Sequence, residues 1–127
     1  MNQTSGSARK EAFRARTKAY ASGVIRLFCT LPKNRVEVQV LGKQLLRSGT
    51  AVAAIYREAS RARSDAEFIS KIETCAQEAD ESALWLELLH EDCGIDGVDL
   101  HTLATETNEL ISIFVAMAKR VKSRLSE

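Results

Sequence analysis

Between Gln44 and Asp92 the chain reads QLLRSGTAVAAIYREASRARSDAEFISKIETCAQEADESALWLELLHED, and this stretch decides its fold. Apolar and small residues recur at alternating steps of three and four on both sides of a short polar break. That spacing places side chains on one stripe of an α-helix, and no β-strand would require it. The stretch therefore predicts a hairpin of two helices.

The polar break also contains a start signal for the second helix. Ser64 stands three residues before Glu67, the capping-box spacing in which the hydroxyl and the carboxylate each satisfy a backbone N–H of the first turn. The flanking segments repeat the helical period, and Pro32 on one side and Gly94 with Gly97 on the other mark the remaining links. We predict helices at about 8–31, 34–61, 64–93 and 98–125, and no strand.

Length and composition indicate the class of protein. A chain of 127 residues with 28% charged side chains is expected to form one soluble domain. Residues 1–10 are polar and small, so we expect a flexible N-terminal tail without a signal peptide. Residues 11–127 are predicted to form a single all-α domain, an antiparallel up-down four-helix bundle. The longest apolar run, residues 110–118, is far shorter than the roughly 20 residues that span a bilayer, so we expect a cytoplasmic protein with no membrane contact.

Charge is divided unevenly along the chain. Residues 1–63 hold 13 Lys and Arg against 3 Asp and Glu, a net of +10, whereas residues 64–127 hold 5 against 14, a net of −9. One half of the bundle is therefore expected to be basic and the other acidic. Such a division can serve a polyanion or can pair the faces of neighbouring subunits, and the sequence leaves both uses open.

Two segments carry more apolar residues than one face of a helix requires. Around Leu84–Leu89 and Ile111–Met117, apolar side chains point in nearly every direction. A helix that is apolar all round must be covered all round. We therefore expect a homo-oligomer, whose interface residues are predicted to be Trp85, Leu88, Ile55 and Phe114.

Several short motifs from Gln44 onward resemble a known family. They are QLLRS at 44–48, YREA at 56–59, Ser64 with Glu67 and Phe68, EADE at 78–81, and WLELL at 85–89. Together they resemble the four-helix-bundle proteins encoded in 23S ribosomal RNA intervening sequences. The resemblance covers the two central helices, whereas the outer helices agree in length and placement.

The resemblance implies a fold and partners. It implies an up-down bundle that assembles into a homopentameric ring, and the broader group includes the accessory protein of diversity-generating retroelements, which binds nucleic acid and partners a reverse transcriptase. Relatives often carry Ser-x-Gly-Ala-Asn where this chain has Ala51–Ile55. The apolar replacement indicates a tighter helix contact, a lineage-specific interface or deliberate engineering, and these alternatives stay open.

Two roles for this protein follow from these observations. The first is a non-enzymatic scaffold or interaction module, and the second is a nucleic-acid-binding accessory factor. For the second role the candidate phosphate-binding residues are Arg47, Arg57, Arg61, Arg63, Arg14 and Lys18, which would repeat around any ring and add their contacts. The alternative is a solvated face whose cations pair with the carboxylates of the third helix, and Glu78 and Glu81 are the predicted structural ion-pair partners.

Catalytic and metal-binding patterns are incomplete. Glu87 and His90 form one Glu-x-x-His element, but a di-iron bundle needs two, and His101 has Val98 three residues before it. We therefore expect no metal site and no cofactor. The sequence lacks nucleophile-elbow, phosphate-loop and dinucleotide motifs, so we expect no enzyme. Three cysteines without CxxC spacing predict buried, reduced thiols.

Overall fold

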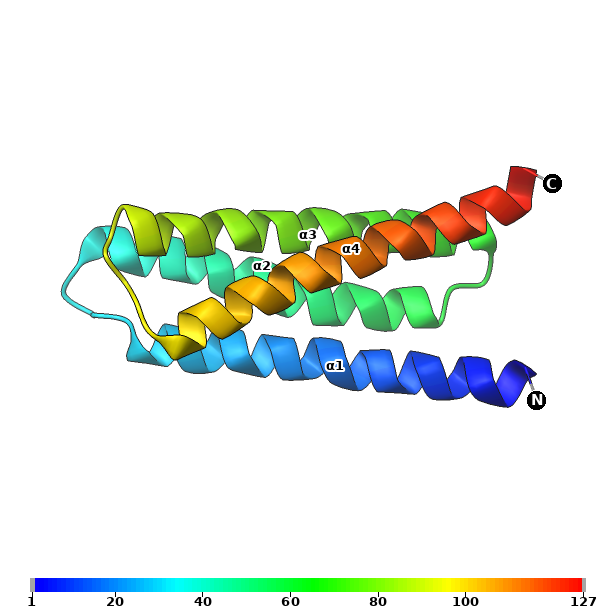
Figure 1. The fold of residues 1–127 in the computed structure, drawn as a ribbon, viewed down its shortest axis with the longest axis horizontal. Coiled ribbons are helices and arrows are strands. Elements are labelled where there is room, and N and C mark those ends of the chain that lie inside the picture. The colour runs from blue at the N-terminus through cyan, green and yellow to red at the C-terminus, as the bar shows by residue number, and fades with distance from the viewer. Residues whose placement is uncertain (1, 127) are drawn as a thin grey trace.

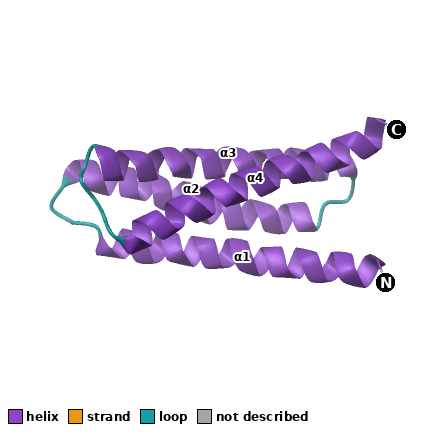
Figure 2. Cartoon of the chain, viewed as in Figure 1, coloured by secondary structure: helices purple, strands orange, loops and turns teal. Residues whose placement is uncertain are grey.

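The computed structural model describes the backbone of residues 2–126 and the side chains of residues 6–126. It contains four helices, α1 (Asn2–Thr30), α2 (Val36–Ser60), α3 (Asp65–Glu91) and α4 (Val98–Ser126), packed as an elongated bundle (Figure 1). No strand occurs among residues 2–126 (Figure 2). The predicted all-α class and the four helices are confirmed. Helix α1 begins earlier than the predicted residue 8, and the flexibility of residues 1–10 stays a prediction.

The links between helices lie where the sequence signals placed them. Pro32 falls between α1 and α2, and Gly94 and Gly97 fall between α3 and α4. The Ser64 hydroxyl accepts a hydrogen bond from the Glu67 backbone N–H at 3.1 Å, as predicted. The Glu67 carboxylate accepts instead from the N–H of Arg63, one residue before the cap, at 3.1 Å. The end of α2 and the start of α3 are thereby tied together.

The core takes apolar side chains from all four helices. Its fully buried members include Val24, Leu45, Val52, Ile72, Leu86, Leu110 and Phe114. Phe13 packs edge-on against Tyr56 and Phe114, with ring centroids 4.8 Å and 5.6 Å apart, a favoured aromatic geometry. Helices α1 and α2 approach closely where Gly42 and Gly49 face Leu31 and Val24. The core is thus continuous from α1 to α4.

Hydroxyl groups from all four helices lie within this core. The Tyr20 hydroxyl is 2.6 Å from Thr107 Oγ1, and Ser48 Oγ is 2.7 Å from Ser82 Oγ. Thr17 is also buried and donates back to its own helix. Burial raises the pKa of the Tyr20 hydroxyl, so this group remains a neutral donor. Because buried hydroxyls require hydrogen-bond partners, these pairs fix the position of each helix along the axis of its neighbour.

The cysteines divide between the core and the surface. Cys75 and Cys93 are buried and free, as expected, and burial raises the pKa of the Cys75 thiol to about 12. Cys29 is exposed, so the expectation of burial was wrong for this residue. It lies on the outer side of the last turn of α1, where no other helix covers it.

Helices α1 and α4 meet at one end of the bundle and diverge toward the other. Helix α4 runs obliquely, from beside α1 at its start to beside α3 at its end (Figure 1). Where the two helices are close, Arg16 donates to both oxygens of Glu106 at 2.8 Å and to Glu109 at 3.0 Å. We call the end with the α1–α2 and α3–α4 links the closed end and the end with both termini the open end.

The close approach of α1 and α2 gives a test by substitution. A Cβ added at Gly49 would lie 2.8 Å from Cγ2 of the buried Val24, whereas nothing lies within 4 Å of a Cβ at Gly6. Gly49→Ala gains at most about 1 kcal/mol of helix propensity, so a variant less stable than the parent shows the clash. Gly6→Ala reports the effect of an alanine at a position with free space. We expect chemical denaturation to show Gly49→Ala less stable than Gly6→Ala by about 1–3 kcal/mol. Equal stability of the two variants would contradict the close packing.

The ion pair between α1 and α4 predicts a pH dependence of stability. The hydrogen bond from Arg16 holds the pKa of Glu106 below its usual range. A carboxylate with a depressed folded pKa stabilises the fold above its unfolded pKa, and this contribution is lost as pH falls through the folded pKa. Arg16→Gln should therefore lower the free energy of unfolding at about pH 7, and this loss should shrink as pH falls through the folded pKa of Glu106.

A matched control tests the assignment to Glu106. Arg16 and Arg26 both line a groove between α1 and α4, but Arg26 makes no ion pair with any described residue. Arg26→Gln should leave the acid dependence of the parent protein unchanged. A carboxyl-detected NMR titration should show the pKa of Glu106 rising in Arg16→Gln. An unchanged Glu106 titration would show that Arg16 does not hold this carboxylate.

Candidate nucleic-acid interface

Cationic side chains gather at the open end around two hollows that share Arg63. A hollow of about 630 Å³ lies between the start of α1, the α2–α3 link and the end of α4. A second hollow of about 360 Å³ lies beside the end of α2 and the start of α3. The cations that line them are Arg9, Lys10, Arg57, Arg61, Arg63, Lys71, Arg120 and Arg124. We call this set the basic end.

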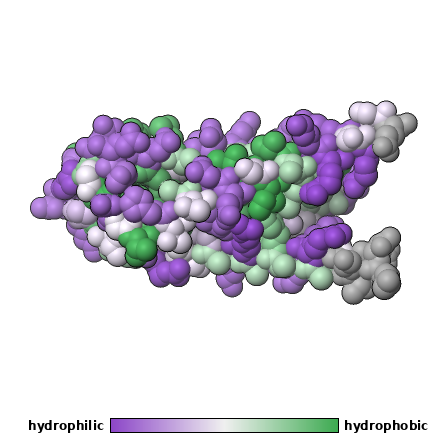
Figure 3. All heavy atoms as spheres, in the orientation of Figure 1, coloured by the Kyte–Doolittle hydropathy of each residue, from purple (hydrophilic) through white to green (hydrophobic). Residues whose placement is uncertain are grey.

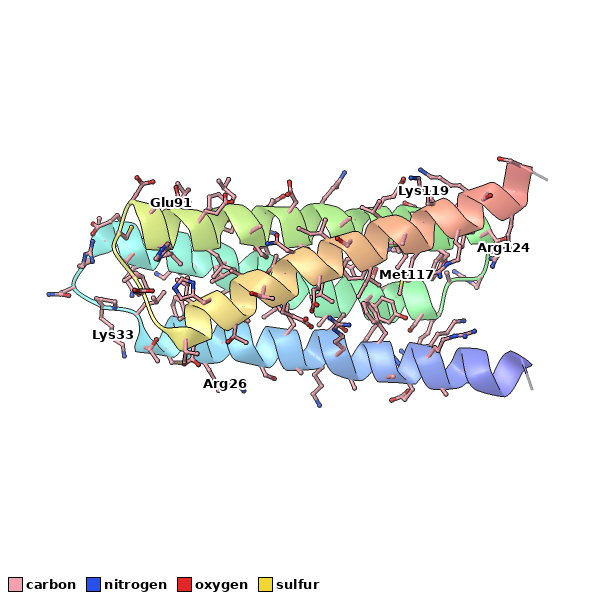
Figure 4. All side chains as sticks on the ribbon, viewed as in Figure 1. Arg26, Lys33, Glu91, Met117, Lys119 and Arg124 are labelled. Carbon is pink, nitrogen blue, oxygen red and sulfur yellow. The ribbon has the colours of Figure 1, made fainter. Side chains whose placement is uncertain are left out.

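The ends of the helices position these residues. Arg57 lies in the last turn of α2, and Arg61 caps that helix with its backbone N–H donating to the Glu58 carbonyl at 3.1 Å. Arg63 follows in the tight link to α3, which the Ser64 cap holds. Three arginines, Arg57, Arg61 and Arg63, therefore lie within seven residues at the end of α2. All three are exposed. Figure 4 shows Arg124 and Lys119 near the same end, on α4.

Most of the basic end lacks acidic partners. Lys71 bonds to Glu58 at 2.6 Å, which raises the pKa of the lysine, and Arg124 lies 3.9 Å from Asp65. The remaining cations make no ion pair with any residue between Gly6 and Ser126: these are Arg9, Lys10, Arg57, Arg61, Arg63 and Arg120. Clustered charges without partners repel one another, so an anion at this end would be stabilised.

Other predicted cations have different surroundings. Arg47 bonds to Glu81 at 2.6 Å and lies 3.3 Å from Glu78, so the structure brings together the arginine and both glutamates considered for structural ion pairs. Arg14 pairs with Glu11 in the same helix. Lys18 is exposed on α1 and lines neither hollow. The structure therefore brings together Arg57, Arg61 and Arg63 and separates them from the other three.

Some contributors to the basic end, among them Lys71, Arg120 and Arg124, were not singled out from the sequence. Arg120 and Arg124 lie far along the chain from Arg9 and Lys10, yet they share one hollow with them. The signal that would have found them is topological. In an antiparallel bundle with four helices, the chain returns to the end at which it began, so both terminal segments lie together.

The residues predicted for a subunit interface differ in exposure. Phe114 is 0% exposed and packs against Phe13 in the core, so the prediction that it reaches an interface was wrong. Trp85 and Ile55 are partly buried against the core, and Leu88 is also partly exposed. The Trp85 indole N–H is buried without a hydrogen-bond partner among the described residues. Phe114 points inward from α4, where Phe13 of α1 and Tyr56 of α2 cover it.

No described helix is long and apolar enough to cross a membrane. Comparison with curated proteins gives no match to this chain.

Known families and solved structures match the chain. The family described as 23S rRNA-intervening sequence protein matches residues 10–116. A crystal structure from Bacteroides thetaiotaomicron, described as a protein of unknown function from the S23 ribosomal protein family, is 31% identical. That match covers 84% of this chain and 97% of the other, with a TM-score of 0.75. The resemblance seen in the hairpin motifs is confirmed, and the chain belongs to the 23S rRNA-intervening sequence protein family.

Proposed function

We propose that the protein is a non-enzymatic accessory module that binds the phosphate backbone of nucleic acid through its basic end. The observation that carries the proposal is the group of cations around the two hollows that lack acidic partners among the described residues. Elsewhere, interhelical pairs such as Arg16 with Glu106 and Arg47 with Glu81 neutralise the charge. The uneven charge of the sequence is therefore reduced along the bundle, and the cations that lack acidic partners cluster around these two hollows.

The chemistry of the basic end favours phosphate over bases. Arginine presents a planar fork of donors that matches phosphate oxygens, and binding releases counterions from the nucleic acid. The aromatic side chains that line the hollows are Tyr56, which is buried, and Phe68, which is partly buried. Neither offers the exposed stacking platform typical of base recognition. We therefore propose binding with little sequence preference and a strong dependence on salt.

A charge-matched pair of variants tests this proposal. The combined change Arg57→Gln, Arg61→Gln and Arg63→Gln should weaken binding of a mixed-sequence RNA or DNA, measured by fluorescence anisotropy over a series of salt concentrations. The slope of log K against log salt should fall by about 2–3, because each lost duplex phosphate contact contributes about 0.9.

The control removes the same charge at the closed end. Arg26, Lys33 and Lys43 make no ion pair with any residue between Gly6 and Ser126, and Figure 4 shows Arg26 and Lys33 far from Arg124. Their combined change to glutamine should alter affinity far less. Equal losses from both triple variants, or no binding by the parent at low salt, would overturn the proposal.

A second candidate role is self-assembly into a scaffold, which exposed apolar side chains favour. Val36, Val40 and Leu84 are 76%, 56% and 45% exposed, and apolar patches interrupt the charged surface in Figure 3. The Ser48–Ser82 contact sets the register of α2 against α3. Val40 on α2 and Leu88 on α3 therefore lie at similar positions along the bundle axis. We propose that copies of the chain share an α2–α3 surface that includes Val36 and Val40 of α2 and Leu84 and Leu88 of α3. The pentameric ring, like a reverse transcriptase partner, rests on the family resemblance.

Self-assembly predicts a mass that is a multiple of the 14.0 kDa chain, measured by size-exclusion chromatography with light scattering. The double change Val40→Glu and Leu84→Glu should reduce that mass, because burying a carboxylate in an interface is costly. Val98→Glu, at a 77% exposed position outside the α2–α3 surface, is the control and should leave the mass unchanged. A parent mass of one chain at all concentrations would refute this role.

A further inference from the structure

The two histidines of the chain meet at the closed end, together with an aspartate. His90 lies in the last turn of α3, His101 in the first turns of α4, and Asp96 in the link between them. One ligand atom from each residue lies within 4.8 Å of the other two, and the two imidazole rings are 5.1 Å apart. The Glu-x-x-His test applied to the sequence could not reveal this arrangement, because the third member lies in a link rather than on a helix.

Hydrogen bonds hold each of the three side chains in place. The Gly97 backbone N–H donates to Asp96 Oδ1 at 2.8 Å, and His101 Nε2 donates to the same oxygen at 2.7 Å. His90 Nδ1 donates to the Ile95 carbonyl at 2.9 Å, since a carbonyl oxygen can only accept. Gly97 has a φ of +136°, a conformation that favours glycine. The link is thus shaped so that Asp96 faces both rings.

The separations are close to those that a bound ion requires. Zinc lies about 2.0–2.2 Å from nitrogen and oxygen ligands, which places neighbouring ligand atoms roughly 3.3 Å apart in a tetrahedral site. Asp96 Oδ1 is 2.7 Å from His101 Nε2 and 3.9 Å from His90 Nδ1. The three side chains are 42–69% exposed, so small rotations suffice to reach coordinating distances.

The surroundings supply space and negative charge. A hollow of about 120 Å³ lies beside the rings and is lined by His90, His101, Glu87 and Glu91. Because this hollow lies beside both rings, it can hold a water molecule as the fourth ligand. Two imidazoles and one carboxylate suit zinc and the neighbouring first-row divalent metals rather than calcium or magnesium, which prefer oxygen ligands alone.

From this geometry we propose that His90, Asp96 and His101 form a binding site for a divalent transition-metal ion of the zinc class. The ion joins the end of α3 to the start of α4. Its binding replaces two hydrogen bonds, because the Nε2 proton that His101 donates to Asp96 and the Nδ1 proton that His90 donates to Ile95 must leave or move to the other ring nitrogen. The site lies at the opposite end of the bundle from the basic end. The proposal of metal binding is therefore independent of the proposal of nucleic-acid binding.

Titration of the full chain with zinc alone and with cobalt alone tests the site. A Cys29→Ser background removes the exposed thiol as a competing ligand. We expect one zinc ion per chain by calorimetry, d–d absorption bands of cobalt in a low-coordinate site, and zinc-dependent shifts of the ring signals of His90 and His101 in NMR spectra. Zinc should also raise the unfolding temperature of the parent protein.

Substitutions then distinguish a specific zinc site at His90, Asp96 and His101 from nonspecific binding of zinc to surface carboxylates. His90→Gln, His101→Gln and Asp96→Asn should each weaken zinc binding at least about tenfold and abolish the cobalt bands. Asp92→Asn, an exposed carboxylate in the same link but outside the cluster, is the control and should bind zinc like the parent. Unchanged affinity in the histidine variants, or equal losses in Asp92→Asn and Asp96→Asn, would overturn the proposal, as would unshifted histidine signals in the parent.

Discussion

The contact that joins α1 to α4 near the middle of the bundle determines how the remaining parts of the structure are arranged. Tyr20 meets Thr107 inside the core, and Arg16 holds Glu106 and Glu109 at its edge. These contacts close the bundle over the start of α4, while its end lies beside α3 (Figure 1). The open end results directly, because the terminal segments of α1 and α4 are left apart with a hollow between them.

The distribution of charge over the bundle follows from the same packing of the four helices. Arginines of α1 and α2 face glutamates of α4 and α3 along the middle of the bundle, so most of the imbalance between the two halves of the sequence is neutralised there. At the open end, arginines from three segments of the chain lie close together. Most of them have no carboxylate partner among the described residues. At the closed end, Glu87, Glu91 and Asp96 surround two histidines. The two ends therefore offer different ligand groups: guanidinium groups for phosphate at one, and imidazole and carboxylate groups for a metal cation at the other.

Local sequence signals predicted much of the fold, because helices and links depend on short-range chemistry. The Ser64 cap and the breaks at Pro32, Gly94 and Gly97 act within one turn of the chain. Periodicity identified which residues face inward but not which neighbour covers the remaining faces, and Phe114 was misplaced for this reason. Arg120, Arg124 and the meeting of His90 with His101 depend on helix packing and on the shape of one link, which no local pattern encodes.

The central claim is that nucleic acid contacts the open end, and cross-linking locates that contact most directly. A photoreactive RNA or DNA bound to the full chain is irradiated, and the attached peptides are identified by mass spectrometry. Attachment is expected within residues 6–10, 57–63 and 117–124, which border the two hollows. Attachment confined to residues 87–101, around the closed end, would contradict the claim.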